Sequence, residues 1–401
     1  MLIKNGLVEV DGQIKFQDIL IENEKIKEIA DEINIISEEV IDAQGGYILP
    51  GVIDPHVHMR DPGLTHKEDF ETGSMACAKG GVTTFLDMPN TIPNTITEEA
   101  LLDKKRDAVG RSYVDYGFYF GGSKNDNSLE VAKVKDMAVA TKVFMNVSTG
   151  NMLVEDEQIL ENIFKSSKLV AVHAEGEMVA KAIELSEKTK TPVYLCHLST
   201  KEEIEMVREA KAKGLEIYAE VTPHHLFLNQ EHVGSDNLLR MKPELKTKED
   251  NEALWEGIVD GTVDTIGTDH APHTLAEKTE KLTFGIPGVQ FSLEMMLKAV
   301  KGERITLEKL KEIMCENPAK IFGIKNKGKL EVGYDADIVI VDMKNEEKIT
   351  NEEVVSKCGW TPYNERTRGG KVMATLVRGN VVYNERRIKK FINNKIGKEV
   401  M

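Results

Sequence analysis

The chain has 401 residues, of which 41% are hydrophobic and 30% are charged, and its formal net charge is −15 at pH 7. This length suits one large barrel or two to three smaller units, and the composition is that of a globular chain. The acidic balance, without a long basic cluster, argues against a nucleic-acid partner and against a membrane-surface role. No apolar run approaches the roughly 18 residues of a transmembrane helix.

The first residues and the cysteines predict the compartment. Residues 1–13 alternate charged and apolar side chains and lack the apolar core and cleavage site of a secretory signal. The four cysteines are far apart and form no CxxC pair: Cys77, Cys196, Cys315 and Cys358. We therefore expect reduced thiols in a cytoplasmic protein.

Both ends of the chain read as short β-strands. The runs with β-type alternation or β-rich composition are residues 15–22, 25–29, 336–342 and 372–383. Gly379-Asn380, between two β-rich runs, predicts a hairpin turn. Neither end contains a histidine, and each needs the other to bury one face of its strands.

The middle of the chain alternates apolar runs with helical patterns. The expected strands are residues 47–53, 83–88, 114–120, 141–145, 169–173, 193–197, 216–221 and 263–268. The expected helices include residues 98–108, 155–164, 177–188, 201–213 and 248–259. Eight strands with intervening helices predict an α/β fold of the (β/α)8 TIM-barrel type. A doubly wound sheet is disfavoured, because no Gly-rich phosphate loop occurs.

Two histidines follow the first apolar run, in Asp54-Pro55-His56-Val57-His58. Side chains alternate along a strand, so both imidazoles face the same side. Neutral imidazoles side by side are costly to bury without a cation and useful with one. A chance pair of surface histidines has the same spacing, but the position at a strand end favours metal ligands.

Three further residues cap other apolar runs: His173, His197 and Asp269. The carboxyl ends of barrel strands converge on one mouth, where active sites lie. Four histidines and one aspartate exceed the three protein ligands of a single catalytic zinc, which suggests two divalent ions. A second ion needs a bridging anion, yet the fourth strand offers Lys142, a cation. The residue pattern alone leaves this point unresolved.

Five segments resemble the motifs of the dihydroorotases in the amidohydrolase superfamily. They are His56-Val57-His58-Met59-Arg60-Asp61-Pro62-Gly63, Asp87-Met88-Pro89-Asn90-Thr91, Val172-His173-Ala174-Glu175, Pro223-His224-His225-Leu226 and Asp269-His270-Ala271-Pro272-His273. The resemblance spans about residues 47–288 in the family's order. It implies a barrel over residues 50–325 and a small β-sandwich built from residues 1–49 and 326–401.

The resemblance implies a metal site with two Zn²⁺ per subunit. His56, His58, His173, His197 and Asp269 match the family's ligands, and Lys142 matches its N-carboxylated bridging lysine. A carbamate on Lys142 would turn the cation into a bridging anion. Some bacterial members use an aspartate bridge instead, but no aspartate of this chain lies at that position.

The activity implied is the reversible cyclisation of N-carbamoyl-L-aspartate to (S)-dihydroorotate with release of water, in de novo pyrimidine biosynthesis. Two cations lower the pKa of a bridging water, so hydroxide exists near neutral pH. That hydroxide attacks the ring amide carbonyl in the hydrolytic direction. Asp269 is then the general acid and base, taking the hydroxide proton and passing it to the ring nitrogen.

The resemblance assigns further residues to the substrate. Arg60, Asn90 and His273 match the contacts of the substrate carboxylate, and a guanidinium binds a carboxylate bidentately. A salt bridge with Asp61 or Glu68 is the structural alternative for Arg60, and a turn is the alternative for Asn90. The remaining matched positions are Lys242, in a Lys-Pro-Glu-Leu-Lys variant of the family pattern, Phe284 and Gly285, in a loop near the ring, and Thr149, in a loop after the Lys142 strand.

Two other classes of function remain open at this point. One is another cyclic amidohydrolase, such as a hydantoinase, dihydropyrimidinase or allantoinase, since the metal site is common to all of them. The other is a non-catalytic scaffold of aspartate transcarbamoylase, which is disfavoured because every expected ligand position is filled. The sequence does not decide between a monomer and a homo-oligomer, nor whether an aspartate transcarbamoylase partner exists.

Overall fold

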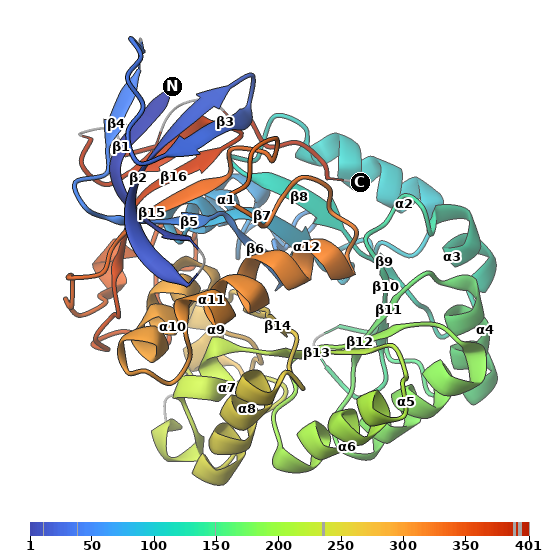
Figure 1. The fold of residues 1–401 in the computed structure, drawn as a ribbon. Coiled ribbons are helices and arrows are strands. Elements are labelled where there is room, and N and C mark those ends of the chain that lie inside the picture. Colours follow the sequence, from blue (N-terminus) through green and yellow to red (C-terminus); the bar gives the residue numbers. More distant parts are fainter. Residues whose placement is uncertain are drawn as a thin grey trace.

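The structure is a computed structural model that describes residues 1–10, 12–37, 39–148, 150–234, 237–387, 390–391 and 395–400. It has α/β character: a sheet formed by both chain ends stands beside a body of parallel strands and outer helices (Figure 1). The figure places the first strands, in blue, directly against the last ones, in orange and red. Residues more than 280 positions apart therefore share one sheet.

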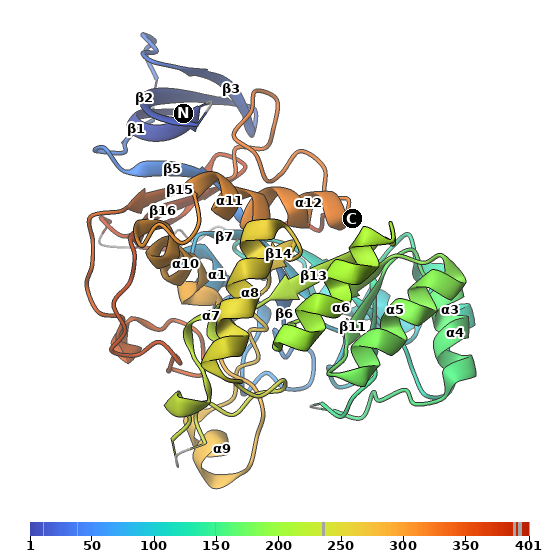
Figure 2. The ribbon, with the colours of Figure 1, turned by 60° about the horizontal axis from the view of Figure 1, so that its bottom comes forward.

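The end sheet has the strand order β17-β16-β15-β5-β1-β2-β3, with β4 paired to β1. Its strands are β1 (Leu2–Val10), β2 (Gln13–Glu22), β3 (Lys25–Ala30), β4 (Val40–Asp42), β5 (Tyr47–Pro50), β15 (Ile338–Asp342), β16 (Lys371–Val377) and β17 (Asn380–Asn384). The two chain ends join where β5 pairs antiparallel with β15, with Ile48 opposite Ile340. Figure 2, turned by 60°, shows this sheet standing above the body of the molecule.

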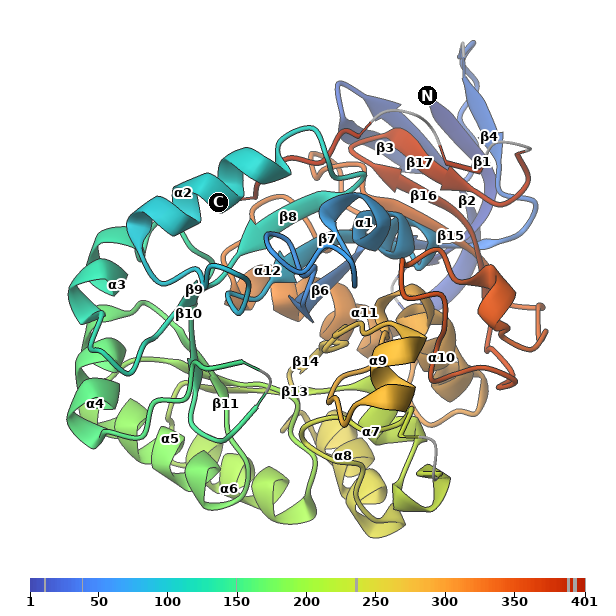
Figure 3. The same cartoon turned by 180° about the vertical axis from the view of Figure 1, so that it is seen from behind.

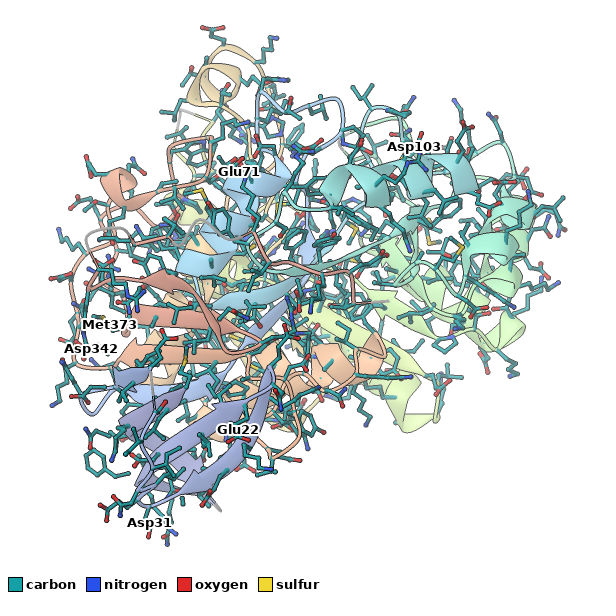
Figure 4. All side chains as sticks on the ribbon, turned by 90° about the horizontal axis from the view of Figure 1, so that it is seen from above. Glu22, Asp31, Glu71, Asp103, Asp342 and Met373 are labelled. Atoms are coloured by element: carbon teal, nitrogen blue, oxygen red, sulfur yellow. The ribbon has the colours of Figure 1, made fainter. Side chains whose placement is uncertain are left out.

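The last hairpin turns one residue earlier than the sequence predicts. Asn380 pairs with Val377, so the two turn residues are Arg378 and Gly379, and the prediction of Gly379-Asn380 is wrong. Both turn residues have positive φ, 46° and 73°, as a type I′ turn requires. Asn380 instead begins the strand β17. Figure 4 labels Met373 on β16 near Asp342 at the end of β15, as expected for paired strands.

The parallel strands lie in two sheets, β6-β7-β8 and β14-β13-β12-β11-β10-β9. They are β6 (Val52–Val57), β7 (Val82–Asp87), β8 (Asp115–Phe118), β9 (Phe120–Gly121), β10 (Thr141–Phe144), β11 (Val170–His173), β12 (Val193–Leu195), β13 (Ile217–Val221) and β14 (Thr265–Ile266). An isolated parallel bridge between Val57 and His270 links the first strand to the segment after the last. The backbone N–H of Phe120 donates to the carbonyl of Ala140, next to β8.

The first expected strand, residues 47–53, is two strands in the structure. Residues Tyr47–Pro50 belong to the end sheet, and Val52–Val57 begins the parallel set. The break falls at Gly51, where a Cβ would lie 2.1 Å from the Thr83 hydroxyl oxygen. Only glycine permits this close approach of the two segments.

The helices up to α8 connect the parallel strands and lie on their outer side, as Figure 3 shows from behind, and the last four helices follow β14. They are α1 (Phe70–Lys79), α2 (Glu98–Ala108), α3 (Ser128–Val134), α4 (Glu157–Ser166), α5 (Glu177–Thr189), α6 (Lys201–Ala212), α7 (Pro223–Phe227), α8 (Lys248–Asp260), α9 (Leu275–Glu280), α10 (Ser292–Lys301), α11 (Leu307–Lys311) and α12 (Asn317–Ile321). The five helices expected from the sequence are present, with ends shifted by at most two residues. Helix α6, for example, begins at a capping box of Thr200 and Glu203, which satisfies two backbone donors.

The long connection between β15 and β16 packs over loops that follow the parallel strands. Cys358 and Trp360 share a small core with Leu228, Met241 and Ile286. The buried Arg368 guanidinium bonds Glu294 of α10 at 2.9 Å and fixes the end of this connection. This part of the chain therefore reaches the edge where the predicted site lies.

Two further features concern the cysteines and the helices. All four cysteines are free and buried in the structure. Among the described residues, no helix combines the length and the apolar character needed to span a lipid bilayer.

Candidate active site

The predicted metal ligands come together at the carboxyl ends of the parallel strands. His56 lies at the end of β6, His173 ends β11, His197 follows β12 and Asp269 follows β14. Ligand atoms of His56, His197 and Asp269 all lie within 4.8 Å of one another. Residues separated by up to 213 positions thus meet at one point, as parallel strands with a common edge require.

The neighbouring ligands extend this group in two directions. His58 Nε2 lies 3.0 Å from Asp269 Oδ1, and His56 Nε2 lies 3.3 Å from the same oxygen. On the other side, His173 Nδ1 lies 2.9 Å from His197 Nε2. The five side chains are almost completely buried.

Burial decides the charge of most of these imidazoles. It lowers the pKa of His58 to about 4 and that of His173 to about 3, so both rings are neutral near pH 7. Burial alone would raise the pKa of Asp269, but the nearby imidazoles of His56 and His58 hold it well below its usual range. Burial acts on His56 too, but Glu220 and Asp269 outweigh it and raise the pKa of this imidazole to about 10. Imidazoles in their neutral form and an ionised carboxylate are the donors that a divalent metal binds.

Two ring nitrogens lack the partner that a buried polar atom requires. Among the described residues, neither His173 Nε2 nor His197 Nδ1 has a hydrogen-bond partner, although both are buried. Leaving such atoms unpaired costs about 1–3 kcal/mol each. Unpartnered nitrogens in such a buried group, together with the close approach of His56, His197 and Asp269, fit a metal site of His and Asp ligands.

Lys142 lies inside the same cluster. It is 1% exposed, and its Nζ lies 2.9 Å from the sulfur of Cys196. Within the described ranges, no carboxylate oxygen lies within ion-pair distance of this ammonium. Burying a cation without a counter-ion is costly in free energy, so the Lys142 side chain needs either an anionic partner or a change that removes its charge.

Three site residues have a left-handed backbone, which is rare outside glycine. Their φ angles are 61° for Arg60, 38° for His197 and 45° for Asp269. Such conformations cost about 1–3 kcal/mol and persist where surrounding contacts impose them. Thr268, next to Asp269, is held by its hydroxyl bond of 2.6 Å to the buried Asp54.

A pocket opens beside the metal ligands. Its lining includes most of the residues predicted to contact substrate: His58, Arg60, Asn90, Ser148, Lys242, Asp269, Ala271, Phe284 and Gly285. His273 lies behind this lining, with its Nε2 3.5 Å from a terminal nitrogen of Arg60. Thr149 lies outside the described residues.

Arg60 does not form the salt bridge that was its structural alternative. Asp61 pairs with Arg111 instead, and Glu68 bonds Thr72 and Ser356. In the part of the chain that the structure describes, no carboxylate lies within 4 Å of the Arg60 guanidinium, whose Nε donates to the carbonyl of Pro272 at 3.3 Å. Burial lowers the pKa of Arg60 only to about 10, so the group stays charged near pH 7.

Asn90 and Gly285 have identifiable local roles. The side-chain oxygen of Asn90 lies 2.7 Å from His58 Nδ1, on the side of the ring opposite Asp269, and so helps to orient the imidazole. Gly285 has φ 133°, and a Cβ there would lie 2.6 Å from the carbonyl oxygen of Ala271. Lys242 lies with its ammonium 5.3 Å from the ring centre of Phe284, so these two pocket residues contact each other.

Sequence reasoning missed the residues that hold the ligands in place. Glu220, in β13, accepts from His56 Nδ1 at 2.8 Å and from the backbone N–H of His197 at 2.8 Å. Its second oxygen accepts from the hydroxyl of Tyr194 at 2.8 Å. A charged residue inside an apolar strand was the available signal, since a fully buried glutamate always needs partners.

Asp87 is a second missed positioning residue. Its carboxylate accepts from the backbone N–H of Met59 at 2.7 Å, between His58 and Arg60. It also pairs with Lys104 at 2.6 Å, and both side chains are fully buried. The Asp87-Met88-Pro89-Asn90 motif contained it, but its contact with the first strand could not be seen in the sequence.

Three histidines outside the predicted ligand set, His66, His224 and His225, differ in their contacts. His225 bonds the hydroxyl of Thr222 and the carbonyl of Pro243, as a structural histidine does. Neither ring nitrogen of the buried His224 has a partner among the described residues. His66 is largely exposed and contacts Glu277.

The comparisons with known proteins identify the family. The profile of the amidohydrolase family matches residues 47–382. The chain belongs to the amidohydrolase family. Proteins named dihydroorotase are similar to it over nearly their whole length: that of Methanosphaera stadtmanae is 36% identical, covering 94% of this chain and 95% of the relative, and that of Lactobacillus gasseri is 36% identical, covering 95% and 98%. The resemblance seen in the motifs is thereby confirmed. The protein is therefore an enzyme, and its class is hydrolase.

Solved structures of a hydantoinase and a dihydropyrimidinase share the fold. The L-hydantoinase (dihydropyrimidinase) of Arthrobacter aurescens superposes with a TM-score of 0.94 at 30% identity, covering 100% of this chain and 99% of the other. The dihydropyrimidinase of Brevibacillus agri has a TM-score of 0.91 at 27% identity, covering 100% and 98%. The fold is therefore common to proteins whose names state different ring substrates, and the choice among them depends on the pocket.

Proposed function

We propose that this amidohydrolase is a dihydroorotase, which interconverts N-carbamoyl-L-aspartate and (S)-dihydroorotate with release or uptake of water. The relatives named dihydroorotase support this, because their similarity covers 94–95% of the chain. The names alone do not separate it from the hydantoinases, whose structures are also similar. The argument for the substrate therefore comes from charge in the pocket.

The buried guanidinium of Arg60 is the observation that carries this proposal. It lines the pocket, is charged near pH 7 and has no carboxylate partner among the described residues. A buried charge without a partner is costly, and an anionic substrate would relieve that cost. Dihydroorotate and N-carbamoyl-L-aspartate carry a carboxylate that such a cation can bind, whereas hydantoin and 5,6-dihydrouracil carry none.

A pair of divalent metal ions, which we propose to be Zn²⁺, would be held by His56, His58, His173, His197 and Asp269. When bound, such ions supply a water of lowered pKa and polarise a carbonyl group. Lys142, buried without a counter-ion, would bridge them as its N-carboxylated form. Its ammonium would first lose a proton, and the resulting amine would then take up carbon dioxide and lose a second proton, so that a cation becomes an anion.

Asp269 is the proposed general acid and base. Its Oδ1 lies beside His56 Nε2 and His58 Nε2 and also lines the pocket. In the hydrolytic direction it would accept the proton of the attacking water and deliver it to the ring nitrogen that leaves. In ring closure it would remove a proton from the ureido nitrogen. Arg60, Asn90 and His273 would hold the substrate carboxylate and so orient the reacting amide.

The proposed function also implies a specific arrangement of the barrel and of the two chain ends. We infer that the two parallel sheets form one (β/α)8 barrel over residues 50–325, since the Val57–His270 bridge links its first strand to the segment that follows its last strand. The segments 1–49 and 326–401 would make the β-sandwich domain. A homo-oligomer and an aspartate transcarbamoylase partner stay predictions.

A substrate panel combined with metal analysis tests the proposal. Purified protein is assayed with dihydroorotate, hydantoin, 5,6-dihydrouracil and allantoin, and its zinc content is measured. We expect turnover of dihydroorotate at least about 100-fold above the others, since losing a buried charge pair costs 2–5 kcal/mol or more. Two zinc equivalents are expected, and mass spectrometry of the native protein should detect the added carbon dioxide on Lys142.

The result that supports the second candidate is equally definite. Faster turnover of hydantoin or dihydrouracil than of dihydroorotate would identify a hydantoinase, in line with the similar solved structures. Full activity on dihydroorotate in protein stripped of metal would contradict the proposed chemistry altogether.

A further inference from the structure

Lys67 lies behind the proposed carboxylate site, and none of the steps above uses it. It stands in the loop between β6 and α1, and its Nζ lies 3.2 Å from His273 Nδ1. The same ammonium lies 3.2 Å from Glu277 Oε1, a residue in the first turn of α9. Lys67 is therefore the link between the first-strand loop and the histidine that faces Arg60.

The contacts of His273 fix which ring nitrogen carries the proton. A lysine ammonium only donates, so His273 Nδ1 must accept from Lys67. The other nitrogen, Nε2, lies 3.1 Å from the carbonyl oxygen of Phe284, which only accepts, so Nε2 must donate. Arg60 also lies 3.5 Å from Nε2 and can only donate, but this is the longest of the three contacts. The two shorter contacts, to Lys67 at 3.2 Å and to Phe284 at 3.1 Å, agree on the neutral tautomer with the proton on Nε2.

The neighbouring charges are consistent with this tautomer. Burial, followed by the cations of Arg60 and Lys67, lowers the pKa of His273 to about 3, so the ring is neutral near pH 7. Glu277 could hold a proton on Nδ1 instead, but its oxygen lies 3.6 Å away, beyond a hydrogen bond. Its own pKa is lowered to about 2, since Lys67 and His66 outweigh its burial, so it is ionised beside Lys67.

We propose that Lys67 is a positioning residue that fixes the Nε2-protonated tautomer of His273, so that His273 and Arg60 present adjacent donors to the substrate carboxylate. The Nε2–H can exchange its bond to the Phe284 carbonyl for one to an anion, whereas the opposite tautomer would offer a lone pair and repel it. Trp360 supports the arrangement, because its indole N–H donates to the His273 carbonyl at 2.8 Å. The inference rests on the proposed function for its substrate, but the tautomer itself does not.

The first test reads the tautomer directly. Zinc-loaded full-length protein is labelled with ring-¹⁵N histidine, and two-bond ¹H–¹⁵N spectra are recorded, with His273→Asn identifying the signal. We expect a protonated Nε2 and an unprotonated Nδ1 near pH 7. In Lys67→Met the ring should lose this fixed state and show the Nδ1-protonated form or a mixture. Lys67→Arg, which keeps a donor, should retain the original pattern.

The second test measures the consequence for binding. In Lys67→Met the KM for dihydroorotate should rise about tenfold with kcat changed less than about threefold, since one charge-assisted contact is weakened. Lys67→Arg should restore most of the KM. Glu277→Gln keeps the lysine donor and serves as the matched control, with the tautomer unchanged.

The outcomes separate this inference from the proposed function. An Nδ1-protonated His273 in the unaltered protein overturns the role of Lys67, whatever the substrate. An Nε2-protonated ring that Lys67→Met leaves unchanged also overturns it. If the tautomer behaves as expected but dihydroorotate is not turned over, the proposed function fails and the positioning role stands. A fall in kcat with unchanged KM in Lys67→Met would contradict the binding role.

Discussion

Two buried groups of charges lie at opposite ends of the parallel strands and differ in one respect. At the amino ends, Asp115 pairs with Lys327 at 2.8 Å and with Arg378 of the end sheet. At the carboxyl ends, Arg60 and Lys142 are equally buried but have no carboxylate partner among the described residues.

The difference teaches how to separate structural charge from functional charge. A buried ion pair that is complete within the chain fixes two segments relative to each other, here the strand β8 and the end sheet. A buried cation without a counter-ion in the chain needs a partner from outside, such as an anionic ligand, or a chemical change of its own side chain. The two cations without a carboxylate partner, Arg60 and Lys142, lie at the carboxyl ends of the strands, where active sites occur in such folds.

At the carboxyl ends of the strands, Asp269→Asn should have the largest effect on turnover. The amide cannot exchange a proton, so kcat for dihydroorotate should fall by about 10²–10⁴-fold, the usual worth of a general acid or base. The zinc content, measured by atomic spectroscopy, should be largely kept, because an amide oxygen can still coordinate. An unchanged kcat would remove Asp269 from the proton transfer.

Lys327→Met removes a cation from the buried ion pairs at the amino ends of the strands. It should lower the free energy of unfolding by about 3–5 kcal/mol, because buried carboxylates then lack their counter-ion. Burial opposes the charge of Lys327, but Asp337 and Asp115 outweigh it and raise its pKa above the usual range. The stabilisation is therefore fully present below the unfolded-state pKa of about 10.4 and is lost as pH rises through the folded-state pKa.

Urea unfolding from pH 6 to 11 measures this prediction. The difference in the free energy of unfolding between Lys327→Met and the unaltered protein should stay constant up to about pH 10 and shrink only above it. Lys329→Met is the matched control two residues away, since its partners Glu316 and Glu331 form only exposed pairs. A loss that already shrinks near pH 8 would contradict the assignment.

Arg60→Met should have opposite effects on stability and on binding. Removing an unpaired buried charge should raise the thermal midpoint of the ligand-free protein, while kcat/KM for dihydroorotate should fall about 100-fold. Calorimetry and steady-state kinetics measure the two effects. Arg106→Met, in the exposed face of α2, is a control for which neither quantity should move. A lower midpoint with unchanged KM would place Arg60 with the structural charges.

Glu220→Gln should give the smallest of these effects. The neutral amide weakens the hold on His56 Nδ1, so zinc affinity should drop about 10–100-fold, as found for partners of metal-binding histidines. Competition with a chelator measures it without any assay of turnover. Tyr194→Phe, which removes only one bond to the same carboxylate, should change zinc affinity less.

The residues of the candidate site were predictable because their position follows from local rules. His173 and Asp269 come at or just after apolar strands, and parallel strands bring their carboxyl ends to one edge. The division of residues 47–53 into two strands was not predictable, because it depends on the approach of Gly51 to Thr83. The turn at Arg378-Gly379 was missed by one residue, since composition locates a turn but register is set by cross-strand pairing.

The sequence by itself determined the family, the strand and helix pattern and the side chains able to bind metal, because these depend on residue type and on spacing along one strand. Only the tertiary structure decided which charges have partners. Glu220 meets His56 across 164 residues, and Lys67 meets His273 across 206. Such contacts follow no periodicity, since they arise where separate elements pack, and they set the protonation and orientation of the groups that the sequence supplies.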